Sequence, residues 1–257
     1  MEYIIICIVA FAGSGLTLFS GFGLGTLLVP VFGIFFPIEI AISLTAIVHF
    51  LNNIFKLFLL GKSANKKVIF NFGIPSVIAA FFGAYVLYLL SDLQALANYS
   101  LFGKEFVIMP MKFVIGVLLM FFALFEIIPR FKNWQVSEKY LAYGGFLSGF
   151  FGGLSGNQGA LRSAFLVKAN LSPQSFIATG VVIACLTDVA RLFVYSNTNL
   201  HFINSGNVSL VASATLCAFA GAFIGNRLLK KITIKTIQYV VAVMLFVFAL
   251  LLGCGII

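Results

Sequence analysis

Charge is scarce in this sequence. Asp, Glu, Lys and Arg make up 9% of the 257 residues, with 7 acidic residues among them, whereas hydrophobic residues account for 61%. A soluble domain carries about 25% charged residues, so this composition excludes a soluble protein. Apolar runs long enough to cross a bilayer recur along the whole chain, and we predict an all-α polytopic membrane protein.

The sequence also lacks the residue clusters on which most enzymes and metal proteins depend. It has no paired carboxylates, no histidine cluster and no nucleophile elbow, so we expect no enzyme, no cofactor and no metal site. No long linker or low-complexity stretch interrupts it, which indicates a single transmembrane domain over residues 1–257. Four cysteines stand alone in apolar segments without metal or redox spacing, and we interpret them as packing residues: Cys7, Cys185, Cys217 and Cys254.

The net charge of +9 has a simple explanation in a membrane protein. Lys and Arg gather in short loops at residues 62–67, 130–139 and 227–235, whereas residues 91–105 and 196–207 are nearly neutral. Cytoplasmic loops of membrane proteins are rich in Lys and Arg. We therefore expect a lipid bilayer as partner rather than nucleic acid, and a multi-pass position in the cell membrane, the cytoplasmic membrane of a bacterium. Assembly into a homo-oligomer stays open.

About eight hydrophobic segments follow one another along the chain. Glycines interrupt two of them, residues 1–31 and residues 140–168. The other six are continuous and cover residues 36–60, 68–90, 107–128, 172–195, 208–229 and 236–257. Because glycine tolerates unusual backbone angles, and non-helical backbone at membrane depth must be buried or line a cavity, each interrupted segment predicts a broken helix inside the protein.

The two halves of the chain, roughly residues 1–128 and 138–257, have the same order of one broken segment and three continuous ones. An offset of 135 residues places Ser155-Gly156 on Ser20-Gly21 and Arg191 on Lys56. We interpret this as an internal repeat of the kind found in transporters. If each broken segment is a hairpin that enters and leaves on one face, all three basic loops are cytoplasmic and the repeats are inverted. Two full crossings per broken segment would keep the same parity, and this alternative stays open.

The strongest candidate site is the break in the second interrupted segment. Asn157 and Gln158 lie at the break, and Arg162 follows within a few residues. A broken apolar segment with polar groups at the break is typical of a transporter's substrate site. Glycine-mediated helix packing would explain the glycines alone. It would not explain the arginine, because an ionisable group inside a membrane costs about 2.5–3.5 kcal/mol.

Polar residues of two continuous segments extend this site. In residues 36–60, His49, Asn52 or Asn53, and Lys56 recur at helical spacing, and we interpret His49 as a packed histidine. Snorkelling near a helix end is the alternative for Lys56 and for Arg191. In residues 172–195, Asp188 and Arg191 are three residues apart and can pair, and Asp188 is our candidate for proton coupling. The candidates for substrate binding are Ser20, Gly21, Gly23, Gly25, Asn52, Lys56, Ser155, Gly156, Asn157, Gln158, Arg162, Thr187 and Arg191.

The sequence resembles the sulfite exporter TauE/SafE family of bacterial and plant membrane transporters (the TSUP family), over nearly its whole length. The resemblance rests on SGFGLGTLLVPVF and AISLTAIVHFLNNIFKLFL in the first half, and on GGFLSGFFGGLSGNQGALRSAFL and ATGVVIACLTDVARLFVY in the second. The family shows a glycine cluster followed by a proline in each repeat. Pro30 matches that pattern, whereas Phe165 stands where the second proline would be. The resemblance implies transport of sulfur-containing or other organic anions.

These observations together predict a secondary transporter for a small organic or sulfur-containing anion of the sulfite or sulfonate type. Exposed backbone N–H groups at helix ends favour an anion, and arginine's planar fork suits oxyanions. A channel for an anion or a small solute, and a structural membrane subunit without transport activity, are the alternatives. Substrate identity, the direction of transport and the coupling ion are not fixed by the sequence.

Overall fold

The computed structural model describes the chain except residues 21–22, 129–136, 168, 199–206 and 229–233. Parts of the loops assigned from charge, at residues 130–139, 196–207 and 227–235, therefore lie outside the described residues. The elements run in the order α1 (Glu2–Ser20), α2 (Gly25–Phe35), α3 (Ile38–Leu60), η1 (Gly61–Ser63), α4 (Lys66–Val68), η2 (Ile69–Gly73), α5 (Ile74–Ser91), β1 (Ala97–Leu101), β2 (Lys104–Ile108), α6 (Pro110–Ile127), η3 (Glu138–Tyr140), α8 (Leu141–Ser155), α9 (Gly159–Leu166), α10 (Pro173–Ser196), α11 (Val208–Leu228) and α12 (Ile234–Gly253).

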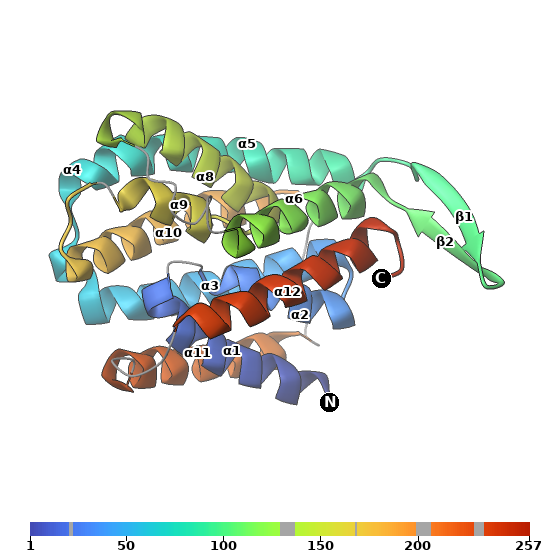
Figure 1. The fold of residues 1–257 in the computed structure, drawn as a ribbon, viewed down its shortest axis with the longest axis horizontal. Coiled ribbons are helices and arrows are strands. Elements are labelled where there is room, and N and C mark those ends of the chain that lie inside the picture. Colours follow the sequence, from blue (N-terminus) through green and yellow to red (C-terminus); the bar gives the residue numbers. More distant parts are fainter. Residues whose placement is uncertain (21–22, 129–136, 168, 199–206, 229–233) are drawn as a thin grey trace.

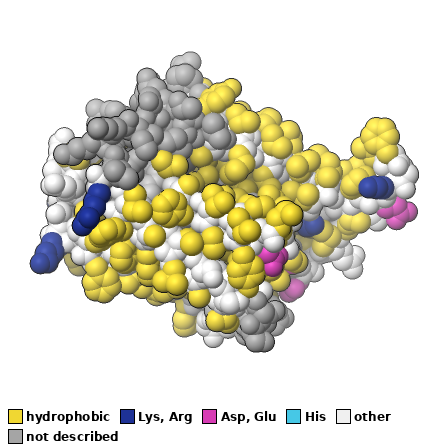
Figure 2. All heavy atoms as spheres, turned by 90° about the horizontal axis from the view of Figure 1, so that it is seen from below, with side chains coloured by type: hydrophobic (Ala, Val, Ile, Leu, Met, Phe, Trp, Pro, Cys, Tyr) yellow, Lys and Arg dark blue, Asp and Glu magenta, His cyan; other side chains and the backbone are white. Residues whose placement is uncertain are grey.

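The predicted all-α polytopic class is confirmed. Each of the six continuous segments contains one long helix, α3, α5, α6, α10, α11 or α12. Four helical stretches in the described part are long and apolar enough to cross a membrane, namely Ile38–Ser63, Lys66–Ser91, Pro173–Ser196 and Val208–Gly225. Hydrophobic side chains cover much of the flank of the helical body, and the Lys and Arg side chains in view lie toward its ends (Figure 2). This is the surface that a bilayer-embedded protein needs.

Both glycine-interrupted segments are broken helices. In the first, α1 ends at Ser20 and α2 begins at Gly25; in the second, α8 ends at Ser155 and α9 begins at Gly159. The 11 residues of α2 and the 8 residues of α9 correspond to lengths of about 16 Å and about 12 Å at 1.5 Å per residue. The hydrocarbon core of a bilayer is about 30 Å thick, so neither short helix crosses it alone.

The helices pack in pairs. The order of segments in the two halves shows which helices are equivalent, and equivalent helices make equivalent pairs. Helix α1 packs along α11, and α8 packs along α5, the element equivalent to α11 in the first half. Helix α3 packs on its own equivalent α10, and α6 packs on its equivalent α12. The packing is therefore the same in both halves, as an internal repeat would require. The inverted orientation of the two repeats stays a prediction.

Glycines hold two of these helix pairs in backbone contact. A Cβ atom added at Gly149 of α8 would collide with the Ser76 carbonyl of α5, and one added at Gly221 of α11 would collide with the Phe11 carbonyl of α1. Close backbone approach is what small residues provide in membranes, where apolar side chains gain nothing by leaving lipid for protein. Of these two glycine-packed pairs, α5–α8 packs against α10, and the α11 helix of the α1–α11 pair packs against α3.

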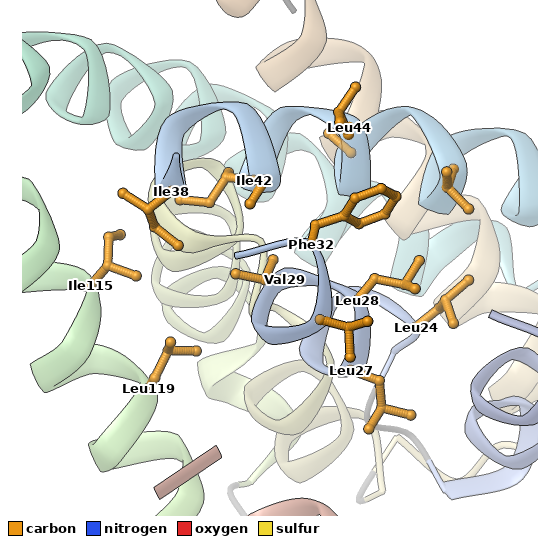
Figure 3. Packing of buried hydrophobic residues seen from close by; sticks show 14 of the residues in the cluster. Leu24, Leu27, Leu28, Val29, Phe32, Ile38, Ile42, Leu44, Ile115 and Leu119 are labelled. Atoms are coloured by element: carbon orange, nitrogen blue, oxygen red, sulfur yellow. The ribbon is translucent and has the colours of Figure 1, made fainter. Parts of the chain in front are cut away.

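The apolar core surrounds α2. Leu24, Leu27, Leu28, Val29 and Phe32 lie on this short helix and the residue before it, and the same cluster contains Ile38, Ile42 and Leu44 of α3 and Ile115 and Leu119 of α6 (Figure 3). Leu24 and Leu27 reach α1, where a Cβ atom added at Gly13 would meet their Cδ1 atoms. A second, smaller cluster of buried apolar residues joins α4 and η2 to α8, α9 and α10. The site described below lies between these two clusters.

One element differs from the prediction, because residues 97–108 form a β-hairpin within what the sequence indicated to be a loop followed by a helix. Strands β1 and β2 pair antiparallel, and Phe102 and Gly103 connect them with φ angles of 50° and 75°. Positive φ at both central residues defines the tight hairpin turn that fits the twist of two strands. The hairpin projects from the helical body at the end where both chain termini lie, opposite α4 (Figure 1).

We predict that Gly149→Ala destabilises the protein by about 1–3 kcal/mol, because the added methyl group must push α5 and α8 apart. Gly253→Ala is the matched control, since its Cβ would meet no atom closer than the Gly116 Cα at 4.0 Å. Thermal unfolding in detergent measures both. Equal unfolding temperatures for the two variants would contradict the proposed role of backbone contact between α5 and α8.

We predict that the hairpin is outside the cell and that the loop before α4 is inside. In a variant without the four native cysteines, Phe102→Cys should react with a membrane-impermeant maleimide in intact cells. Lys62→Cys should react only after permeabilisation, because its basic loop is expected on the cytoplasmic side. Both residues are exposed, so access to reagent decides the result. The reverse labelling pattern would overturn the orientation.

Candidate functional site

The two helix breaks touch each other inside the protein. Gly23 in the first break and Gly156 in the second both have left-handed backbone, with φ of 85° and 78°. A Cβ atom at Gly25 would lie 2.9 Å from the Gly156 carbonyl oxygen, and one at Gly23 would lie 4.0 Å from the Gly159 Cα. A side chain at Gly25 would push the two breaks apart, so close contact requires glycine there. At Gly23 and Gly156, the left-handed backbone favours glycine.

A fully buried carboxylate lies beside the breaks, where α3 packs on α10. Asp188 of α10 accepts from Arg191 Nε at 2.9 Å and lies 2.7 Å from Arg191 Nη2. Its other oxygen is 2.6 Å from His49 Nδ1 and accepts from Asn53 Nδ2 at 3.3 Å. The amide of Gln158, at the second break, donates to Asp188 at 3.5 Å. The Asp188–Arg191 pair expected from their spacing is present, and the carboxylate joins α3, α10 and the break.

Arg191 connects this network to the second break. Its side chain is fully buried, and a Cβ atom at Gly156 would lie 3.0 Å from Arg191 Nη1. One turn later, the Tyr195 hydroxyl donates to the Gly153 carbonyl in the last turn of α8, at 2.5 Å. Two side chains of α10 thus hold the end of α8 in place. Snorkelling of Arg191 to the membrane surface is wrong, because the residue is enclosed.

A small cavity of about 40 Å³ opens next to the breaks. Its lining comes from α1, the first break, α3, α9 and α10, and the residues are Thr17, Gly23, Leu24, His49, Asn53, Lys56, Arg162, Ser163, Leu166, Phe176, Ile177, Gly180 and Val181. By volume it has room for a few water molecules. An elongated ligand would need the cavity to widen.

Two cations face this cavity without a countercharge. Lys56 is 4% exposed and Arg162 is 8% exposed, and neither has an ion-pair partner among the residues that the structure describes. Arg162 Nη1 is buried without a hydrogen bond, and the guanidinium lies over Gly180, whose missing side chain leaves room for it. With its amide oriented to satisfy both ends, Asn52 accepts from Lys56 Nζ at 3.2 Å. Lys56 is therefore held inside the protein by a neutral partner, which rules out snorkelling.

The structure separates the predicted site residues into three groups. Gly23, Lys56 and Arg162 line the cavity. Packed behind it or at the breaks, without lining it, are Gly25, Asn52, Ser155, Gly156, Asn157, Gln158, Thr187, Asp188 and Arg191. The side chain of Ser20 and the whole of Gly21 lie outside the described residues. Among the described residues, Asn157, which seemed central in the sequence, donates to the nearby Ser155 alone, at 3.4 Å to its carbonyl oxygen.

Several residues that line the cavity were not among the predicted binding residues. His49, interpreted as a packed histidine, contacts both Asp188 and the cavity. Asn53 lies 135 residues before Asp188, so the two are equivalent in the repeat, and they contact each other directly. The offset alone could have indicated this pair, because equivalent positions meet near the axis of a two-fold repeat. Thr17, Ser163 and Gly180 carried no comparable signal. Among the described residues, no group of three or more His, Cys, Asp or Glu side chains could hold a metal ion.

Broken membrane helices that meet beside a polar cavity are the mark of a membrane transporter. Comparison with known families supplies the particular family. The family described as Sulfite exporter TauE/SafE matches residues 5–252, and the chain therefore belongs to it. This confirms the resemblance seen in the sequence, and it places the chain among multi-pass membrane transporters rather than enzymes. No curated protein matches the sequence.

We predict that Asp188→Asn lowers the free energy of unfolding by about 3–5 kcal/mol, because it leaves Arg191 buried without its countercharge. The control is Glu138→Gln, which breaks the exposed Lys67–Glu138 pair at 3.6 Å and should cost less than about 1 kcal/mol. Thermal unfolding in detergent compares them. If Asp188→Asn unfolds at the wild-type temperature, the carboxylate does not hold the site together.

Proposed function

We propose that the protein is a secondary transporter that carries a small organic or sulfur-containing anion, of the sulfite or sulfonate type, across the cytoplasmic membrane of a bacterium. Arg162 and Lys56 bind the anion in the cavity beside the two helix breaks. The family gives the transporter class, and the charges around the cavity support an anionic substrate.

The observation that carries this proposal is the imbalance of buried charge. Lys56, Arg162 and Arg191 are buried cations, and Asp188 is the one buried acid among the described side chains. Asp188 is already paired with Arg191 and contacts His49, so it cannot also neutralise the two cations that face the cavity. An isolated charge inside a membrane is costly, whereas an anion between Lys56 and Arg162 would offset that cost. The site is electrostatically incomplete until an anion enters.

The helix breaks support the same conclusion. Helices α2 and α9 both begin where the breaks meet, so the N-terminal ends of both helices lie beside the site. The N-terminus of a helix attracts negative charge through its first N–H groups and the helix dipole. Arginine binds carboxylate and sulfonate groups through two parallel hydrogen bonds, which a lysine at the same position could not match.

We predict that one or more anions raise the unfolding temperature of the purified protein, and that Arg162→Gln abolishes the effect. The panel contains sulfite, sulfate, thiosulfate, sulfoacetate, taurine and simple carboxylates. A ligand at about 100 times its Kd stabilises the native state by about 2.7 kcal/mol. Arg227→Gln is the matched control, because Arg227 is exposed and its guanidinium lies over the Phe223 ring, outside the cavity.

The Arg227→Gln control distinguishes anion binding at the proposed site from a general effect of the protein's positive charge. If Arg227→Gln loses the stabilisation as fully as Arg162→Gln does, the anions act on overall charge and the proposed site is wrong. If no anion stabilises the wild type, the anion-transport proposal is wrong. For an anion that does bind, saturable uptake into liposomes that accelerates with the same anion on the far side supports a transporter, and flux that never saturates indicates a channel.

A further inference from the structure

His49 stands at the boundary between the buried carboxylate and the cavity. Its Nδ1 lies 2.6 Å from Asp188 Oδ2, and its other ring nitrogen faces the first helix break, where a Cβ atom at Gly23 would lie 3.6 Å from Nε2. The side chain is 3% exposed and lines the cavity together with Lys56 and Arg162. The imidazole therefore touches the charge network on one side and the proposed anion site on the other.

The contacts of Asp188 fix how the imidazole can carry a proton. With Nδ1 protonated, His49 donates to Asp188. The Asn53 amide nitrogen lies 3.1 Å from Nδ1 and 3.3 Å from Nε2, and it can donate only to the unprotonated Nε2. A second proton can then be added only at Nε2, on the side of the cavity, after the Asn53 amide has turned. A carboxylate that holds the far nitrogen of a histidine in this way sets its tautomer and orients the ring.

We propose that His49 is the proton-binding residue of the cavity, that anion entry draws a proton onto its Nε2, and that anion and proton therefore move together. This inference rests on the proposed anion transport. Asp188 is then a positioning residue, which holds Nδ1–H and stabilises the imidazolium. The sequence suggested Asp188 itself as the proton carrier, but its contacts with Arg191, His49, Asn53 and Gln158 leave it no access to the cavity.

The charges around His49 give the direction of this coupling. Arg191 and Cys185 of α10 lie near Asp188, Lys56 follows on α3, and Arg162 faces the same cavity from α9; the described residues of the first break add no ionisable group. In the empty cavity these three cations oppose a further positive charge. An anion between Lys56 and Arg162 offsets much of this positive charge and so lowers the cost of protonating His49, and the proton therefore binds after or with the anion.

Histidine suits this role because its ordinary pKa, about 6.5, allows it to gain and lose a proton in the physiological range. The sequence has two histidines, His49 and His201, and this makes the test simple. His201 lies outside the described residues, and His201→Gln serves as the matched control.

The test is calorimetric titration of the wild type, His49→Gln and His201→Gln with sulfate and with methanesulfonate, whose charges do not change between about pH 5 and about pH 8. Comparing buffers of different ionisation enthalpy gives the number of protons taken up per anion. For the wild type and His201→Gln, we expect uptake of up to one proton and an affinity that rises up to about tenfold for each unit of falling pH. For His49→Gln, we expect binding without proton uptake and without this pH dependence.

The outcomes distinguish the two proposals. If His49→Gln binds the anion and still takes up the proton, His49 is not the proton site, and the anion site stands. If the wild type binds neither of these anions nor any anion of the panel above, the anion site is wrong and the coupling fails with it.

A second measurement does not depend on the folding of the His49 variant. In His201→Gln, ¹⁵N-labelled histidine reports His49 alone, and saturating sulfate or methanesulfonate should convert its signals from those of a neutral ring to those of an imidazolium. Unchanged ring signals with the anion bound would overturn the inference.

Discussion

The cost of holding charge inside a membrane shapes the centre of this protein. Three cations and one carboxylate are buried where α3 and α10 pack together beside two broken helices. Each ion would cost several kcal/mol if left alone in a medium of low dielectric constant. Asp188 reduces that cost by contacting Arg191 and His49 at once. The remaining excess of positive charge faces the cavity, and this excess defines what the site can bind.

The long arms of the two broken segments are packed against full-length helices. Backbone contact at Gly149 and Gly221 joins α8 to α5 and α1 to α11, so the long arm of each broken segment is fixed against a full-length helix. The short arms α2 and α9 are then the parts that present their N-terminal ends to the cavity. Glycine packing therefore fixes the long arms, whereas the first break, α9, α3 and α10 supply most of the residues that line the cavity.

Helix α9 carries two side chains with different surroundings. Arg162 lines the cavity one turn after the start of α9, and Phe165 is buried against Phe72 in the smaller apolar cluster. One face of α9 therefore presents an arginine to the cavity, and the other anchors the helix to the packing beside α5.

The sequence by itself determined the membrane class, the continuous helices and the two breaks, because hydrophobic length and glycine position are local properties of the chain. It also predicted the Asp188–Arg191 pair, whose spacing places both side chains on one face of a helix, and the cavity position of Arg162 and Lys56. It did not predict the β-hairpin, whose Phe102–Gly103 turn carries a weak signal.

Only the tertiary structure decided which polar groups meet. His49 and Asp188 are 139 residues apart, and Gly25 and Gly156 come from different halves of the chain. Such contacts depend on how α3, α10 and the breaks pack, which no local pattern contains. For the same reason the roles of His49 and Asn157 could not be judged from their neighbours in sequence. Burial and partners in space fix the charge state of a polar residue, and the fold supplies both.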